Sequence, residues 1–149
     1  MNTSRIKLAI IDDAPILSNG LLYTLHGYSN FEVITTTTVT EELLNQMRHQ
    51  PVDILLVDIL RYMRGDNLGK KVKEQFPDVK ILVLSMNNHD RYMSNCVLND
   101  PHVTGFLSDN AGTRELIIAL EAIAIGSDYY STDLVCAHEQ FLVRKKNNK

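Results

Sequence analysis

The chain has 149 residues, enough for one folded domain with a real core, and 44% of them are hydrophobic and 22% charged. This composition argues against disorder, and the formal net charge of -3 gives no electrostatic reason for the domain to bind nucleic acid or an anionic membrane. No signal core follows Met1 and no apolar stretch is long enough to span a bilayer, so we expect a cytoplasmic protein with no membrane partner.

Short runs rich in β-branched residues alternate along the chain with segments of helical periodicity. In chain order, the strands are predicted at residues 6–11, 31–37, 53–57, 80–84 and 104–107. Apolar residues at helical spacing follow each strand. Five such β/α units predict an α/β fold, with a five-stranded parallel sheet that is doubly wound and carries helices on both faces.

Local signals set several boundaries. Thr38 and Glu41 have the spacing of a capping box before the second helix, and Gly126 suits the end of the fifth. After Gly126 the pattern weakens and the chain closes on a basic segment. We therefore predict a domain over residues 1–126, and a linker with a short helix and a basic tail over residues 127–149.

Polar side chains follow the predicted strands at their carboxyl ends, where open α/β sheets bind ligands. Asp12 and Asp13 follow the first strand, Asp58 the third and Ser85 the fourth. Carboxylates about 4 Å apart repel by roughly 4 kcal/mol at an effective dielectric of 20, so a cation is expected, and oxygen ligands without Cys or His favour Mg²⁺. Asp58 is then the natural phosphoryl acceptor. The alternative is that these acids only cap the helices that follow.

Several stretches together resemble the receiver domains of response regulators of the NarL/FixJ (LuxR) type, which have the CheY-like, flavodoxin-like fold. They are Ile-Ile-Asp-Asp-Ala-Pro at 10–15, Asp-Ile-Leu-Leu-Val-Asp-Ile at 53–59, Leu-Val-Leu-Ser-Met at 82–86 and Gly-Phe-Leu at 105–107. Each stretch is weakly specific alone, but their order and spacing are specific together. The resemblance covers about residues 6–133.

The resemblance implies a two-component signalling protein in which a sensor histidine kinase phosphorylates Asp58. It also implies a possible homodimer, transcription regulation through a DNA-binding output domain absent from this chain, and no enzymatic turnover. The implied site residues are Mg²⁺ ligands at Asp13, Asp58 and the backbone carbonyl of Leu60, with Asp12 acting mainly through water, and a switch formed by Ser85 and Phe106. For Phe106, plain core packing explains the residue equally well.

Two positions depart from the family pattern. Where receivers have a lysine after the fifth strand, this chain has Asp109, so a cation is replaced by an anion. The loop after Asp58 is longer than usual and lacks its proline. Arg61 and Arg64 in that loop are candidates for the missing positive charge, although long charged side chains in loops are usually solvated, which is the interpretation we favour.

Asp109 motivates a second hypothesis, a pseudo-receiver that works without phosphorylation in dimerisation or partner docking. Two further classes fit the residues less well. An aspartyl-nucleophile phosphatase needs an acid two residues after its nucleophile, where this chain has Leu60. A flavodoxin-like FMN binder needs a phosphate-binding loop after the first strand, where Asp12 and Asp13 would repel phosphate.

Overall fold

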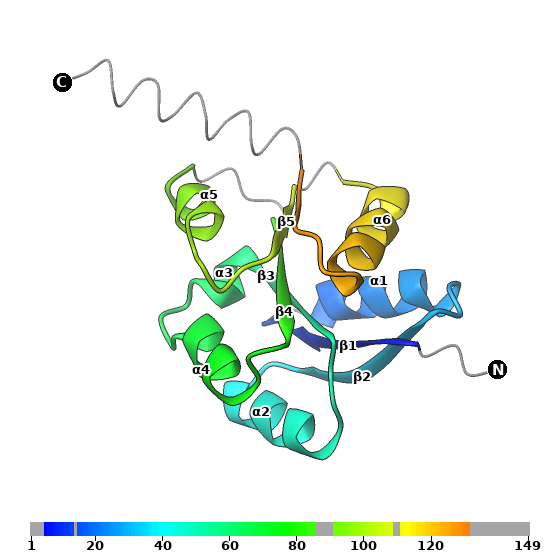
Figure 1. Cartoon of the computed structure of the whole chain (residues 1–149), viewed down its shortest axis with the longest axis horizontal. Coiled ribbons are helices and arrows are strands. Elements are labelled where there is room, and N and C mark those ends of the chain that lie inside the picture. Colours follow the sequence, from blue (N-terminus) through cyan, green and yellow to red (C-terminus); the bar gives the residue numbers. More distant parts are fainter. Residues whose placement is uncertain (1–4, 14, 86–90, 109–110, 132–149) are drawn as a thin grey trace.

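Figure 1 shows the computed structural model of the chain, which describes residues 5–13, 15–85, 91–108 and 111–131. The strands are β1 (Ile6–Ile11), β2 (Phe31–Thr37), β3 (Ile54–Asp58), β4 (Lys80–Leu84), β5 (Gly105–Leu107) and β6 (Tyr129–Tyr130). The helices are α1 (Pro15–His26), α2 (Thr40–His49), α3 (Ile59–Tyr62), α4 (Leu68–Gln75), α5 (Arg91–Leu98) and α6 (Thr113–Ala124).

All of these strands are parallel and form one sheet in the order β2-β1-β3-β4-β5-β6. The doubly wound α/β fold is therefore confirmed. The strand count of five is corrected to six within the described residues, because β6 pairs with β5, with Tyr129 opposite Gly105 and Tyr130 opposite Phe106. A two-residue strand is too short to show a periodicity, which is why the sequence does not reveal it.

The chain after β6 is tied to the domain by Ser131, which is buried. Its backbone N–H donates to the Phe106 carbonyl at 3.0 Å, and its Oγ accepts from the Ser108 N–H at 3.0 Å and donates to Glu115 at 2.8 Å. Part of the stretch read as linker thus packs on the sheet and on α6. The division at residue 126 into domain and linker stays a prediction.

Helices cover both faces of the sheet, as the alternation of strand residues requires (Figure 1). Alternate residues such as Leu8 and Ile10 on β1 pack with α1 and α6 on one face. Their neighbours Ala9 and Ile11 pack with α2, α3, α4 and α5 on the other face. The sheet is therefore buried on both sides, and its carboxyl edge is where side chains can meet a ligand.

Local signals differ in how well they predicted the ends of helices. Gly126 has a φ of 98° after α6, and its N–H donates to the Ile123 carbonyl at 3.0 Å, so the predicted C-terminal glycine is confirmed. The capping box is wrong, since α2 starts after Val39 and no side chain caps it. The Thr38 carbonyl instead accepts hydrogen bonds from Arg61. Within the described residues, no helix is long and apolar enough to cross a membrane.

Candidate functional site at the carboxyl edge of the sheet

The register of the central strands brings three of the predicted site residues to one edge. Ile11 of β1 lies opposite Val57 of β3, so Asp12 and Asp58, one residue later, stand at the same level on neighbouring strands. Asp58 lies opposite Leu84 of β4. Ser85 therefore follows one step beyond, where it is buried and its N–H donates to the Leu107 carbonyl at 2.8 Å.

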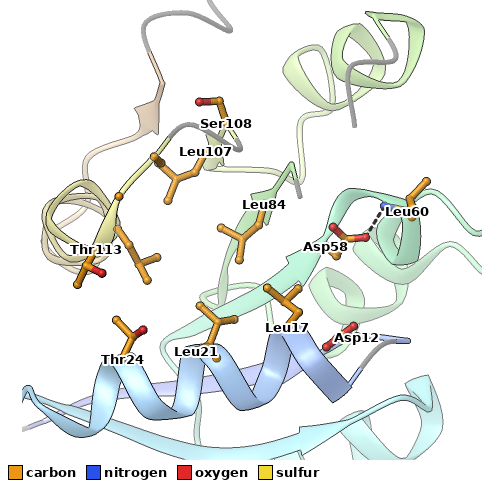
Figure 2. A pocket seen from close by; sticks show the side chains of 14 residues that line it. Asp12, Leu17, Leu21, Thr24, Asp58, Leu60, Leu84, Leu107, Ser108 and Thr113 are labelled. Atoms are coloured by element: carbon orange, nitrogen blue, oxygen red, sulfur yellow. Dashed lines mark hydrogen bonds between the residues drawn. The ribbon is translucent and has the colours of Figure 1, made fainter. Parts of the chain in front are cut away.

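The carboxylates of Asp12 and Asp58 are oriented by backbone N–H groups of the helices that follow them. Asp58 precedes α3, and its Oδ2 accepts a hydrogen bond from the Leu60 N–H at 3.0 Å (Figure 2). Asp12 is buried, and its Oδ2 accepts from the Ser18 N–H of α1, also at 3.0 Å. The capping alternative is thus right about the geometry of Asp58, which is the N-cap of α3, whereas Asp12 stands three residues before α1. Capping does not conflict with chemistry here, because it fixes where each carboxylate points.

Asp13 is held differently from its neighbour Asp12. Its Oδ1 lies 2.7 Å from Nη1 of Arg64 and 3.3 Å from Nε of Arg61, and its side chain is 47% exposed. The carboxylate predicted to be a magnesium ligand is therefore paired with two guanidinium groups.

This arrangement does not fit a magnesium ion held by Asp12, Asp13 and Asp58. Over the ranges that the structure describes, no three Asp, Glu, His or Cys side chains group closely enough to hold a metal ion. Mg²⁺ requires near-octahedral oxygen ligands at about 2.0–2.1 Å. The Oδ1 of Asp13 lies 2.7 Å from Nη1 of Arg64, so a guanidinium group competes with a metal ion for this carboxylate. The ligand set with the Leu60 carbonyl stays a prediction.

Arg61 is the unexpected residue of the site, because its side chain is 0% exposed. Its Nη2 donates to Thr40 Oγ1 at 2.7 Å and to the Thr38 carbonyl at 3.3 Å, and its Nη1 lies 3.3 Å from Asp66. The prediction of two solvated loop arginines is wrong for Arg61. A buried guanidinium is tolerated only when it is paired and hydrogen-bonded, and here acceptors from three parts of the chain surround it.

Asp66 completes this cluster. Burial favours the neutral acid, but the hydrogen bond from Thr40 at 2.6 Å and the charges of Arg61 and Arg64 outweigh it and lower the pKa of Asp66 below its ordinary value of 3.8. Asp66 is therefore ionised at neutral pH. We refer to Asp13, Thr40, Arg61, Arg64 and Asp66 as the arginine cluster.

Phe106 and Asp109 complete the predicted set. Phe106 is fully buried in the core on the α2–α5 face of the sheet, where its ring fills space between strands and helices. Its position is that of a core residue, and its role as a switch with Ser85 stays a prediction. Asp109, the departure from the family lysine, lies outside the described residues.

A cavity of about 580 Å³ opens beside Asp12 and Asp58. Figure 2 shows Leu17, Leu21 and Thr24 of α1 on one side of it and Leu107 and Thr113 on the other. The two carboxylates stand at one end of a largely apolar hollow between α1 and α6. The hollow therefore leaves space next to the two carboxylates at the carboxyl edge of the sheet.

Sequence comparison assigns the chain to a family over most of its length. Residues 8–121 match the response regulator receiver domain. The chain belongs to this family. Oxygen regulatory protein NreC of Staphylococcus carnosus is 30% identical over 127 residues, which cover 83% of this chain and 57% of NreC. The predicted NarL/FixJ-type resemblance is confirmed by this relative, and the chain spans less than two thirds of the relatives that it matches first.

Solved receiver domains have the same fold. The isolated receiver domain of RcsB from Salmonella enterica serovar Typhimurium, with phosphomimetic BeF₃⁻, superposes with a TM-score of 0.75 at 25% identity and covers 90% of this chain and 99% of that one. A structure of two RcsB dimers bound to two parallel DNAs has a TM-score of 0.79 at 24% identity, with coverage of 91% and 69%. The chain is thus a response regulator receiver domain, whose relatives are regulators.

The arginine cluster is the part of the site that sequence reasoning missed. A signal was present, since Arg61 and Arg64 lie close to Asp66 in the chain, three and six residues after Asp58. Spacing alone does not show whether a loop arginine turns inward, because that depends on acceptors such as Thr38 and Thr40, which are about twenty residues earlier in the chain.

Proposed function

We propose that this receiver domain accepts a phosphoryl group at Asp58 from the phosphohistidine of a sensor histidine kinase. The observation that carries the proposal is the placement of Asp58, which stands at the end of β3 beside Asp12, with its carboxylate fixed by Leu60 at the mouth of the cavity. Positioning of this kind supplies much of the catalysis in phosphoryl transfer.

In the proposed reaction an oxygen of Asp58 attacks phosphorus. A P–O bond forms as the P–N bond to the imidazole breaks, and the electron pair of that bond returns to the ring. The product is an acyl phosphate on Asp58. It adds negative charge at the end of β3, next to the end of β4, where Ser85 would donate a hydrogen bond to a phosphoryl oxygen and Phe106 would follow.

Receiver domains generally use Mg²⁺ at the phosphorylation site, where the ion offsets the charge of the phosphoryl group. Here Asp13 is paired with Arg61 and Arg64, so the positive charge next to it comes from the chain itself. Arg64 stands at the same edge of the site with its side chain 47% exposed, so it can contribute positive charge toward an incoming phosphate.

The rest of the proposal concerns the whole protein. By analogy with the RcsB dimers bound to DNA, the domain would form homodimers and control a DNA-binding output domain outside this chain, and we place this activity in the cytoplasm. Because the chain has a net charge of -3, we expect the output domain and not the receiver to bind DNA.

The test is to incubate the chain with a small acyl phosphate and weigh it intact. We expect one added phosphoryl group in the wild type and none in Asp58→Asn, which keeps nearly the same size and an acceptor oxygen for the Leu60 N–H. Asp53→Asn is the matched control, because Asp53 is an exposed acid that accepts from the Lys7 N–H at the opposite end of β3. Equal labelling of wild type and Asp58→Asn would contradict the proposal.

The arginine cluster favours one second candidate. A receiver whose Asp13 is already neutralised by the chain itself would suit a pseudo-receiver, which docks partners or dimerises in one fixed state. The same mass measurement separates the two functions. A wild-type chain that stays unlabelled while its oligomeric state is unchanged by the phosphodonor would favour the pseudo-receiver.

A further inference from the structure

The charges around Asp13 determine how well this site can bind Mg²⁺, a question beyond the proposed function. We infer that Arg61 and Arg64 act as a built-in cation, which neutralises Asp13 and competes with Mg²⁺ for it. The inference rests on the proposed function only in placing Mg²⁺ at this edge of the sheet. Its evidence is the arginine cluster itself.

Arg61 is fixed within the cluster by its burial and its partners. Its side chain is 0% exposed, and its Nε, Nη1 and Nη2 face Asp13, Asp66, Thr40 and the Thr38 carbonyl at distances from 2.7 to 3.4 Å. Withdrawing the guanidinium would remove the donor to the buried Thr40 hydroxyl and to the Thr38 carbonyl, and would break the ion pair with Asp66. Positive charge is therefore a permanent part of this site, in contrast to an ion that exchanges with solvent.

Arg64 contacts the carboxylate that a metal ion would use. Its Nη1 lies 2.7 Å from the same Asp13 Oδ1 that Arg61 approaches, and its Nη2 lies 4.0 Å from Asp66. Its side chain is 47% exposed, so this guanidinium can be displaced. Arg64 is thus the adjustable half of the built-in cation and Arg61 the fixed half.

The charges of the two acids and the two arginines in the cluster balance. Asp13 and Asp66 carry two negative charges, and Arg61 and Arg64 carry two positive ones, so the four side chains are neutral together. The lowered pKa of Asp66 agrees with this balance. A divalent ion at Asp13 would stand beside two guanidinium groups, and like charges at this range disfavour it.

The turn after α3 explains how Asp66 reaches Arg61. After α3 the chain turns through Gly65, with a φ of 99°, and Asn67, with a φ of 57°. These left-handed residues reverse the backbone on either side of Asp66, so that Asp66 faces Arg61, which precedes the turn. The turn therefore helps to form the arginine cluster.

The experiment measures Mg²⁺ affinity directly, by isothermal titration calorimetry at fixed ionic strength. We expect weak binding in the wild type and binding about fivefold tighter in Arg64→Gln, because the competing charge at Asp13 is gone. Arg5→Gln is the matched control. Arg5 pairs with Glu32 with a side chain 52% exposed, close to the 47% of Arg64, and it stands before β1, at the other end of the strand from Asp13.

A further variant locates the effect. Asp13→Asn combined with Arg64→Gln should lose the gain in affinity, since the ion would no longer meet a carboxylate there. Equal affinities in wild type and Arg64→Gln, an equal gain in Arg5→Gln, or a gain that survives Asp13→Asn would each overturn the inference. Labelling of Asp58 is measured separately, so failure of the proposed function would not be mistaken for failure of this inference.

Discussion

Replacing Arg61 by methionine should destabilise the domain more than replacing any exposed arginine. Methionine keeps much of the side-chain length but removes every donor, so the Thr38 carbonyl loses its two contacts from Arg61, and Asp66 loses its buried partner. The hydroxyl of Thr40 still has Asp66 at 2.6 Å. The substitution therefore mainly removes the partner of the Asp13 and Asp66 carboxylates and of the Thr38 carbonyl.

The magnitude follows from how exposed those partners are. Breaking a fully buried ion pair costs roughly 3–5 kcal/mol, but the side chains of Asp66 and Asp13 are 25% and 47% exposed and can recover some hydration. We therefore expect about 3 kcal/mol, which for a domain of this size lowers the melting temperature by roughly 6–12 °C. Arg5→Gln, the exposed control, should cost under about 0.5 kcal/mol.

The assay is urea unfolding followed by circular dichroism, extended to a double-mutant cycle with Asp66→Asn. Because Arg61 and Asp66 are in contact, the cycle should give a coupling energy of about 1–3 kcal/mol. A cost for Arg61→Met no larger than that of Arg5→Gln, or a coupling energy near zero, would refute the buried-pair reasoning.

Two further predictions concern pH. The pKa of Asp66 is lowered in the folded state, so the carboxylate stabilises the fold above its ordinary pKa of 3.8, and this contribution is lost as the pH falls through the lower folded value. The loss of stability caused by Asp66→Asn, measured from urea midpoints, should therefore shrink toward acid pH. A loss that stays constant with pH would contradict this. Burial raises the pKa of Tyr62, with help from the hydrogen bond to Asp100 at 2.6 Å and its charge. The Tyr62 hydroxyl therefore stabilises the folded state below its ordinary pKa of 10.0, and this contribution is lost as the pH rises above that value. The free energy of unfolding should fall more steeply with rising alkaline pH in the wild type than in Tyr62→Phe. An identical pH dependence in the two proteins would count against the contact.

The fold was predictable because parallel sheets leave a strong pattern. β1, β2 and β4 lie within the residues expected from their β-branched, apolar runs, and the ends of β3 and β5 differ by one residue. β1 and β4 are apolar runs inside the sheet, so their hydrophobicity locates them, whereas β2 at the edge is located by its β-branched residues. β6 has two residues and is held by contacts with β5 and by Ser131, which only tertiary structure reveals.

The site was predictable in position and not in its electrostatics. The end of a strand fixes where Asp12 and Asp58 lie, so counting residues from β1 and β3 was sufficient. Whether Asp13 meets a metal or an arginine depends on the path of the chain from Leu60 to Asp66, which forms the end of α3 and the turn after it. It also depends on acceptors supplied by Thr38 and Thr40. Side-chain charge is visible in a sequence, but the direction of a long side chain is not.

The central claim is that Asp58 is the phosphoryl acceptor of a receiver whose Asp13 is neutralised by arginine. The most direct measurement maps the modified residue, by treating the chain with an acyl phosphate, digesting it and sequencing the labelled peptide by mass spectrometry. The account predicts a single label on Asp58, absent from Asp58→Asn and retained in Arg5→Gln. A label on another residue, or none in the wild type at any Mg²⁺ concentration, would contradict it.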